Sequence, residues 1–197
     1  MVVFGDQLPL ARKYVSDLAT RGEELGLIGP LELPRLWSRH LINCGLVSPL
    51  LKPGTVGDVG SGAGLPGLVL AIARPDVALV LIEPMERRVE WLRHEAVELG
   101  LSNVSVVRAR AEEARLDLPL DQVTARAVTS LSGLVPMCVP LVRPGGELIF
   151  MKGARVDDEV LAAQKAIRKA KLRKVEVITL GEGITTEVTR VFRATVD

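Results

Sequence analysis

The chain has few aromatic residues, cysteines and histidines, and almost no net charge. Aromatic side chains make up only 3% of its 197 residues, which argues against a stacking platform for single-stranded nucleic acid. Cys44 and Cys138 form no C-x-x-C pair, and His40 and His94 stand alone, so neither a redox pair nor a metal site is expected. The net charge of +1 excludes a basic field over the whole protein but not a local basic patch.

Long hydrophobic runs are also missing. No segment approaches about 18 consecutive apolar residues, and Met1 to Leu10 lacks the charged start and apolar run of a signal peptide. We therefore expect a cytoplasmic protein that does not cross a membrane. Because 48% of the residues are hydrophobic, the chain can bury one large core. We expect one structural domain, with a helical extension at residues 1–53 before a core at residues 54–197.

The spacing of apolar residues predicts two helices, at residues 6–27 and 31–43, followed by alternating strands and helices. Strands are expected near residues 55–59, 77–82, 104–108, 121–125 and 147–151, and helices near 65–73, 85–99, 130–141 and 157–170. A turn is expected at Arg143-Pro144-Gly145-Gly146. Two β-rich segments with a hairpin-like connection, 174–180 and 186–196, end the chain. This order predicts an α/β fold whose mostly parallel, seven-stranded sheet ends in an antiparallel strand pair.

A glycine-rich turn between the first predicted strand and its helix is the most informative motif. It reads Asp58-Val59-Gly60-Ser61-Gly62-Ala63-Gly64-Leu65-Pro66-Gly67 and stands where a doubly wound sheet binds its ligand. Gly60, Gly62 and Gly64 lack a Cβ, so the backbone can take positive φ and a ligand can approach closely. The G-x-G-x-x-G spacing from Gly62 fits a dinucleotide. The longer spacing from Asp58 fits S-adenosylmethionine (SAM), whose amino group and sulfonium suit a nearby carboxylate.

Two further acidic positions indicate an adenosine-bearing cofactor without choosing which one. Glu83 ends the second predicted strand, where a carboxylate can accept both ribose hydroxyls; the alternative is a capping acid before the helix near Met85. Ala111 and Glu112 follow the third strand and are candidates for the adenine side. Glu112 is also explained as an exposed acid at a helix start. The terminal strand pair favours SAM, because a dinucleotide dehydrogenase would need a further substrate domain for which no residues remain.

Several segments in consistent order carry a family resemblance. They are Leu36–Leu41, Asp58–Gly67 with its Leu-Pro-Gly ending, Arg110–Glu113, Ala125–Ala127 followed by Ser130-Leu131, and Met151–Gly153. Over roughly residues 30–153 the chain resembles the GidB/RsmG family of bacterial small-subunit ribosomal RNA guanine methyltransferases. One departure is visible: Asn43-Cys44 stands where many members have Asp-Ser, which leaves the role of that acid open here.

The resemblance implies a Rossmann-like class I SAM-dependent methyltransferase that acts on nitrogen 7 of a guanine in 16S ribosomal RNA. It implies a cofactor pocket with the residues Gly60, Leu65, Glu83, Ala111, Glu112 and Arg126, and no metal. The lone pair of guanine nitrogen 7 is already nucleophilic, so a site without an obvious general base suffices. Other acceptors are disfavoured: the fourth strand is followed by Ala125-Arg126-Ala127-Val128 rather than Asn or Asp before Pro-Pro-aromatic, and neither cysteine has the setting of a carbon-5 methyltransferase.

Arg126 is the residue we expect at the transfer site. It follows the fourth strand, at the carboxyl edge where the cofactor methyl should point, and its guanidinium could orient the base or a phosphate. A salt bridge with a neighbouring acid would be a purely structural explanation. A small-molecule methyltransferase, a dinucleotide oxidoreductase and a non-catalytic RNA-binding module remain alternative functions.

Local basic clusters are the expected contacts for the partner, ribosomal RNA or the small ribosomal subunit. One cluster, Arg35, Arg39 and His40, lies in the helical entrance, and Lys152 follows the fifth strand. The densest basic run contains Lys165, Arg168, Lys169, Lys171, Arg173 and Lys174. A solvated helix face explains that run equally well. We expect a monomer.

Overall fold

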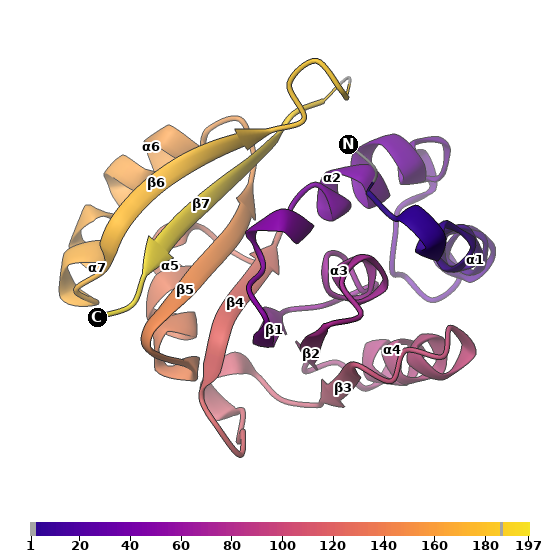
Figure 1. The fold of residues 1–197 in the computed structure, drawn as a ribbon, viewed down its shortest axis with the longest axis horizontal. Coiled ribbons are helices and arrows are strands. Elements are labelled where there is room, and N and C mark those ends of the chain that lie inside the picture. The colour runs from indigo at the N-terminus through magenta and orange to yellow at the C-terminus, as the bar shows by residue number, and fades with distance from the viewer. Residues whose placement is uncertain (1–2, 186) are drawn as a thin grey trace.

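A computed structural model describes residues 3–185 and 187–197 as a seven-stranded sheet with helices on both faces (Figure 1). The strands are β1 (Gly54–Val59), β2 (Val77–Ile82), β3 (Val104–Val107), β4 (Leu120–Arg126), β5 (Val142–Lys152), β6 (Arg173–Leu180) and β7 (Thr189–Thr195). Their order is β3-β2-β1-β4-β5-β7-β6, and β7 runs antiparallel to both β5 and β6. This confirms the predicted α/β sheet with its antiparallel C-terminal pair.

Helices cover the two faces of the sheet as two groups. One face carries α1 (Leu8–Arg21), α3 (Gly67–Ala73) and α4 (Glu86–Glu98), and the other carries α5 (Leu131–Cys138), α6 (Val156–Ala162) and α7 (Gln164–Lys169). The short helix α2 (Ile42–Gly45) precedes β1. Further single turns are η1 (Gly5–Gln7), η4 (Ser48–Leu50), η5 (Ala111–Glu113) and η6 (Val139–Leu141). Each helix group buries its own apolar cluster against the sheet.

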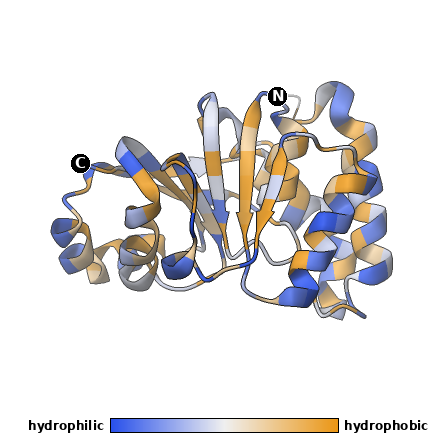
Figure 2. Cartoon of the chain, turned by 90° about the horizontal axis from the view of Figure 1, so that it is seen from below, coloured by the Kyte–Doolittle hydropathy of each residue, from blue (hydrophilic) through white to orange (hydrophobic). Residues whose placement is uncertain are grey.

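The core follows from nearly continuous apolar strands, as expected for strands buried on both faces. The β2 residues read Val-Ala-Leu-Val-Leu-Ile, and Leu148 to Met151 of β5 are all buried. In Figure 2, hydrophobic residues are frequent in the strands at the centre of the molecule, and the helices beside them mix hydrophobic and hydrophilic residues. Within the described ranges, no helix has both the length and the apolar character needed to span a bilayer.

The two helices predicted at the N-terminus are only partly correct. The first ends at Arg21 rather than near residue 27. After Arg21 the chain passes through Gly22 and the positive-φ Gly26 into a turn. Residues 31–43 do not form one α-helix but a 3-10 segment, η2 (Pro30–Arg35), a π-helical segment, η3 (Leu36–Leu41), and α2. Pro34 lies inside η2 and lacks the N–H that a regular helix would need.

Smaller corrections apply elsewhere. The helix predicted at 157–170 is divided at Ala163 into α6 and α7. The predicted turn at residues 143–146 lies inside β5, which begins at Val142 and shifts register against β4 before Glu147. The last two strands are an antiparallel pair as predicted, but β7 begins at Thr189. Its predicted start at residue 186 lies outside the described residues.

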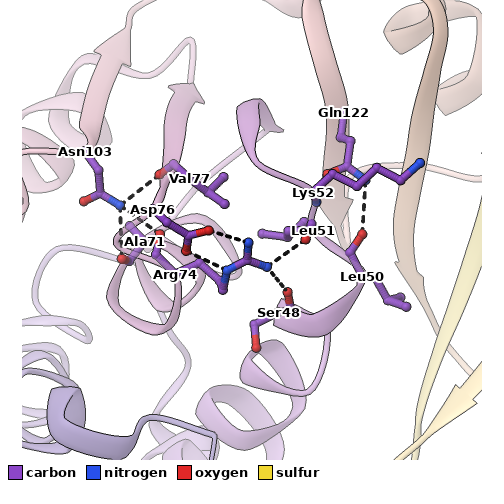
Figure 3. Close-up of polar contacts among 10 residues, drawn as sticks. All are labelled: Ser48, Leu50, Leu51, Lys52, Ala71, Arg74, Asp76, Val77, Asn103 and Gln122. Atoms are coloured by element: carbon purple, nitrogen blue, oxygen red, sulfur yellow. Dashed lines mark hydrogen bonds and ion pairs between the residues drawn. The ribbon is translucent and has the colours of Figure 1, made fainter.

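Polar contacts at the amino ends of the strands join the helical entrance to the sheet (Figure 3). Arg74 follows α3 and donates to the carbonyl oxygens of Ser48 and Leu51, at 2.9 Å and 2.7 Å. The side-chain amide of Gln122 donates to the Leu50 carbonyl, and its oxygen accepts from the Lys52 N–H. Residues 48–52 are therefore fixed to the sheet next to the predicted boundary at residues 53 and 54.

Candidate active site

The glycine-rich turn connects β1 to α3 at the carboxyl edge of the sheet. Gly60, Gly62 and Gly64 all have positive φ, of 71°, 55° and 100°, as the sequence predicted. A Cβ at Gly60 would lie 2.7 Å from the Val128 side chain, and one at Gly64 would lie 2.4 Å from Leu68. At these two positions the packing, as well as the backbone, therefore requires glycine.

Buried side chains from both neighbouring helices hold this turn in place. The Ala63 carbonyl accepts a hydrogen bond from the Tyr14 hydroxyl at 2.9 Å and another from the Trp91 indole N–H at 2.8 Å. Tyr14 is fully buried and Trp91 is 2% exposed. Because a buried carbonyl is fixed from α1 and α4 at once, the conformation of the turn is set before any ligand binds.

Asp58 lies beneath the turn and is fully buried. One carboxylate oxygen accepts from the Gly67 N–H at the start of α3, at 3.0 Å. The other, Oδ1, has no hydrogen-bond partner among the described residues. Burial raises the pKa of this carboxyl to about 7, because the charged form loses its hydration. Asp58 thus caps α3 and keeps one oxygen available for a further donor.

Glu83 follows β2 and faces the same turn. One of its carboxylate oxygens accepts from the Gly62 N–H at 2.9 Å, and the other accepts from the Met85 N–H at 3.0 Å. The second contact is the helix-capping arrangement that the sequence left open, since α4 begins at Glu86. Each oxygen has capacity for more than one hydrogen bond. Capping and ribose binding are therefore compatible in Glu83.

An open cavity of about 430 Å³, the Glu83 cavity, lies beside these groups. Four of the predicted cofactor residues line it: Gly60, Glu83, Ala111 and Glu112. Five others, Asp58, Gly62, Gly64, Leu65 and Arg126, are not among its lining residues. Asp58 lies beneath the turn, Gly62 and Gly64 belong to the turn itself, and Leu65 packs against the apolar cluster of α1 and α3.

A second open cavity, of about 790 Å³, adjoins the first and is called the Arg126 cavity. Its lining contains four basic side chains, Arg126, Arg39, Lys152 and Arg190, and two carboxylates, Glu159 and Glu187. The lining therefore has an excess of positive charge. Ala127 lines both cavities and has a φ of 54°, which is uncommon and strained for a residue with a side chain. A third open cavity, of about 520 Å³, also reaches Ala127, so the end of β4 is where the Glu83 and Arg126 cavities and this third one come together.

Within residues 3–185 and 187–197, the guanidinium of Arg126 is held by neutral partners and forms no direct salt bridge. Its Nη1 donates to the Cys44 sulfur at 3.2 Å, and its Nη2 lies 2.6 Å from Nδ1 of His40. The Cys44 side chain is fully buried, and burial raises the pKa of its thiol. Guanidinium carries more N–H groups than these two, so Arg126 can still donate into the cavity.

The predicted basic cluster at the entrance is largely paired with carboxylates. Arg35 forms an ion pair with Glu187, and Arg39 pairs with Glu32 at 3.2 Å and with Glu187 at 3.8 Å. Nε2 of His40 lies 2.6 Å from Glu32. The cluster therefore exists as a group of charges at the cavity mouth, but as a neutralised one.

The other predicted RNA contacts lie in two different places. The Lys152 ammonium group lies at the Arg126 cavity, 2.7 Å from Glu159 and 2.9 Å from the Thr129 carbonyl. Lys165, Arg168 and Lys169 are exposed on α7. That helix leads into the start of β6, which pairs with the end of β7 near the C-terminus, away from the cavities (Figure 1).

Several side chains at the site were not predicted. Asn43 and Cys44 were noted only as a departure from the family pattern, and no role was given to Glu32, Glu187 or Arg190. The spacing of Glu32, eight residues before His40, is no recognisable signal, and nothing local connects residues 187–190 with β4. Among the described residues, no group of three or more His, Cys, Asp or Glu could hold a metal ion.

Comparisons with solved structures show the fold. A SAM-dependent methyltransferase from Aquifex aeolicus matches with a TM-score of 0.59 at 20% identity, over 83% of this chain and 93% of that one. A precorrin-6y C5,15-methyltransferase from Geobacter metallireducens matches with a TM-score of 0.59 at 18% identity, over 87% and 91% of the two chains. The chain thus has the methyltransferase fold.

Comparisons of sequence identify the family. The model of the family GidB, described as rRNA small subunit methyltransferase G, matches residues 7–188. A protein of Leifsonia xyli subsp. xyli named ribosomal RNA small subunit methyltransferase G is 66% identical over 98% of this chain and 93% of its own length. One of the same name from Pseudarthrobacter chlorophenolicus is 52% identical over 99% and 91%. The chain therefore belongs to the rRNA small subunit methyltransferase G family.

Proposed function

We propose that this chain transfers a methyl group from SAM to nitrogen 7 of a guanine in 16S ribosomal RNA. Family membership and the methyltransferase fold support SAM use and ribosomal RNA methylation. The observation that carries the assignment of the site is the junction of two cavities at Ala127, directly after Arg126. A methyl donor in one cavity and an acceptor base in the other would meet at that junction, which is what an in-line transfer requires.

The Glu83 cavity is the proposed cofactor site. Glu83 accepts the ribose hydroxyls while it keeps its contacts with Gly62 and Met85. The backbone of Gly60 and Ala111 and the side chain of Glu112 line the adenosine side. Asp58, Gly62, Gly64 and Leu65 act by shaping the turn, and the unpaired oxygen of Asp58 can reach the amino-acid part through water. When bound, SAM supplies a methyl group activated by the sulfonium charge.

The Arg126 cavity is the proposed acceptor site. Nitrogen 7 of guanine needs no proton removed before it attacks, so the protein has to align the base and exclude competing geometries. The free N–H groups of Arg126 can donate to an oxygen of the base or to a phosphate, which fixes the acceptor against the junction. No step in this account needs a general base. The alternative of a dinucleotide oxidoreductase is not favoured by the family or the fold.

Ribosomal RNA would approach from the mouth of the Arg126 cavity. Phosphates could exchange with Glu32 and Glu187 as partners of Arg35 and Arg39, since exposed ion pairs contribute little stability. Lys152 and Arg190 extend the basic lining inside the cavity. His40 is buried beside Arg126 and is not among the residues that line the cavity. We further propose that the chain works as a monomer in the cytoplasm, and that Lys165, Arg168 and Lys169 of α7 contact a more distant part of the subunit.

Mapping of methylated nucleotides tests the proposal. Small-subunit ribosomal RNA from cells with and without the protein is compared, and the purified protein is then supplied with SAM and either naked RNA or assembled subunits. We expect one 7-methylguanosine to be lost in the deletion strain and restored in the reconstituted reaction. An unchanged modification pattern, or methylation of small metabolites alone, would overturn the proposal. Guanine methylation at an exocyclic amine would correct the acceptor atom only.

A further inference from the structure

Three side chains from distant parts of the sequence form one hydrogen-bonded chain that ends at the junction of the cavities. Glu32 lies on η2, His40 on η3 and Arg126 at the end of β4. The Glu32 carboxylate lies 2.6 Å from Nε2 of His40, and Nδ1 of His40 lies 2.6 Å from Nη2 of Arg126. His40 is 8% exposed. The imidazole thus bridges an acid and a guanidinium inside the protein.

The chemistry of the partners determines where the imidazole proton lies. A guanidinium can only donate, so Nδ1 of His40 must be the unprotonated acceptor. The carboxylate of Glu32 accepts, so Nε2 carries the hydrogen and donates to it. Both ring nitrogens of His40 are therefore used within the protein. A direct contact between His40 and an RNA phosphate would require the breaking of one of these bonds.

The surrounding charges favour the neutral imidazole. Burial lowers the pKa of His40, and the guanidiniums of Arg126 and, more weakly, Arg39 lower it further, while Glu32 raises it. The hydrogen bond from His40 lowers the pKa of the Glu32 carboxyl. Two other groups face this chain: the buried Cys44 thiol beside Arg126, and Glu187 beside Arg39.

A neutral acceptor has a specific advantage for Arg126. A carboxylate in the place of His40 would orient the guanidinium equally well, but it would neutralise the charge that is needed for an RNA oxygen. The imidazole fixes the direction of Arg126 and leaves its full positive charge for the substrate. The negative charge of Glu32 stays one side chain further away.

We infer that His40 is a positioning residue for the methyl transfer. In the neutral Nε2–H tautomer, fixed by Glu32, His40 holds Arg126 at the junction of the two cavities. Protonation of His40 places an N–H on Nδ1 opposite the guanidinium, so the hydrogen bond is lost and Arg126 is released. This inference rests on the proposed function for its effect on activity. The hydrogen-bonded chain itself can be tested without any substrate.

The first test is nitrogen-15 NMR of the imidazoles. The protein has 2 histidines, and His94 is exposed on α4, so a His94→Gln variant leaves His40 as the single imidazole. We expect a neutral ring at pH 7 with the proton on Nε2, and a titration midpoint below that of a free imidazole. A ring protonated at pH 7, or a proton on Nδ1, would overturn the inference.

The second test measures methyl transfer as a function of pH. His40→Leu should lower kcat about 10- to 100-fold, because it removes a hydrogen bond to a charged group, with little change in SAM affinity. We expect the kcat of the wild type to fall at acid pH, as His40 becomes protonated. His40→Asn, whose side-chain oxygen can replace Nδ1 as acceptor, should recover most of the loss seen in His40→Leu and should abolish that fall. His94→Gln is the matched control and should behave as the wild type.

The outcomes separate the two proposals. Equal kcat for His40→Leu and the wild type, or an unchanged acid limb in His40→Asn, would refute the positioning role while methyl transfer itself stands. If the wild type transfers no methyl group to small-subunit RNA, the proposed function fails, and the NMR measurement alone decides whether His40 holds Arg126.

Discussion

The acidic side chains near the glycine-rich turn and those near the entrance arginines differ in burial and in their hydrogen-bond donors. Beside the glycine-rich turn, Glu83 lines its cavity and Asp58 lies beneath the turn; both are nearly or fully buried and accept from backbone N–H groups, whereas Glu112 at the same cavity is exposed. At the entrance arginines, Glu187 lines the Arg126 cavity and Glu32 lies outside its lining; both are partly exposed and accept from histidine or arginine side chains, whereas Glu159 in that cavity accepts from Lys152 and from the Leu131 N–H. The backbone thus fixes the carboxylates of Asp58 and Glu83. The carboxylates of Glu32 and Glu187 form ion pairs whose partners can be exchanged.

The difference fits the ligands proposed for the two sides. A small cofactor is bound by fixed, dry groups whose geometry need not change. An RNA phosphate can instead take over the arginine partners of a carboxylate, because exposed ion pairs are weak and sensitive to salt. Substitutions on the two sides should therefore affect different measurements.

Arg126→Ala should have the largest effect on methyl transfer. If it lowered SAM affinity instead of kcat, the division of roles between the two cavities would be wrong. Loss of an oriented donor at the acceptor is expected to lower kcat about 100- to 1,000-fold. SAM affinity, measured by calorimetry, should fall far less. Arg12→Ala, at an exposed arginine on α1, is the control. Normal turnover by Arg126→Ala would contradict the role of this residue.

Acidic residues on the two sides should give opposite pH dependences of stability. The pKa of Asp58 is about 7 in the folded chain, against 3.8 in its unperturbed state, so between these values only the folded state keeps the proton. The free energy of unfolding should therefore fall as pH rises from about 4 to about 7, by an amount on the order of 3 kcal/mol.

Asp58→Asn should remove that contribution, as measured by urea unfolding at several pH values. Glu32 provides the contrast, because its pKa is lowered: its contribution is present at neutral pH and is lost as pH falls through the folded pKa. Glu32→Gln should accordingly flatten the acid side of the profile. Identical pH profiles for wild type and Asp58→Asn would refute the buried, proton-retaining carboxyl.

Glu83→Gln tests the proposed cofactor site separately from RNA binding. The variant keeps one acceptor oxygen but loses the charge that binds both backbone and ribose donors, so SAM affinity should fall about tenfold. RNA affinity in the absence of SAM should not change. Glu86→Gln, at an exposed glutamate paired with Arg108, is the matched control. Equal SAM affinity in all three proteins would remove Glu83 from the cofactor site.

Glu187→Gln should have the smallest effect. Unlike the other substitutions, which weaken activity or binding, it should strengthen RNA binding. It releases Arg35 and Arg39 from their shared carboxylate, so RNA affinity should rise about two- to fivefold at low salt, with a steeper dependence on salt concentration. Fluorescence anisotropy with a labelled RNA fragment measures both. Glu182→Gln, on the same connection between β6 and β7, controls for net charge. Weaker RNA binding by Glu187→Gln would contradict the exchange of partners.

The sequence predicted the position of the glycine-rich turn, because the features of that turn are local. The strand, the glycines and the following helix are contiguous in the chain, and the positive φ of Gly60, Gly62 and Gly64 follows from their residue type. The parallel direction of most strands also follows from the alternation of strands and helices. Boundaries failed where proline or a register shift interrupted an apolar pattern, as at Pro34 and in β5 before Glu147.

The acceptor side could not be predicted in the same way, because it is assembled from separate segments. Residues 32–44, 126, 152 and 187–190 come together only in the folded chain. A count of basic residues identified Arg35 and Arg39 but not the carboxylates that pair with them. It also gave most weight to the run on α7, which lies near the C-terminus and away from both cavities.

The most direct test of the two-cavity account is a crystal structure with S-adenosylhomocysteine. We expect the adenosine in the Glu83 cavity, with its ribose hydroxyls on the Glu83 carboxylate and its sulfur facing Ala127 and the Arg126 cavity. An adenosine bound in the Arg126 cavity, among Arg39 and Lys152, would contradict the account.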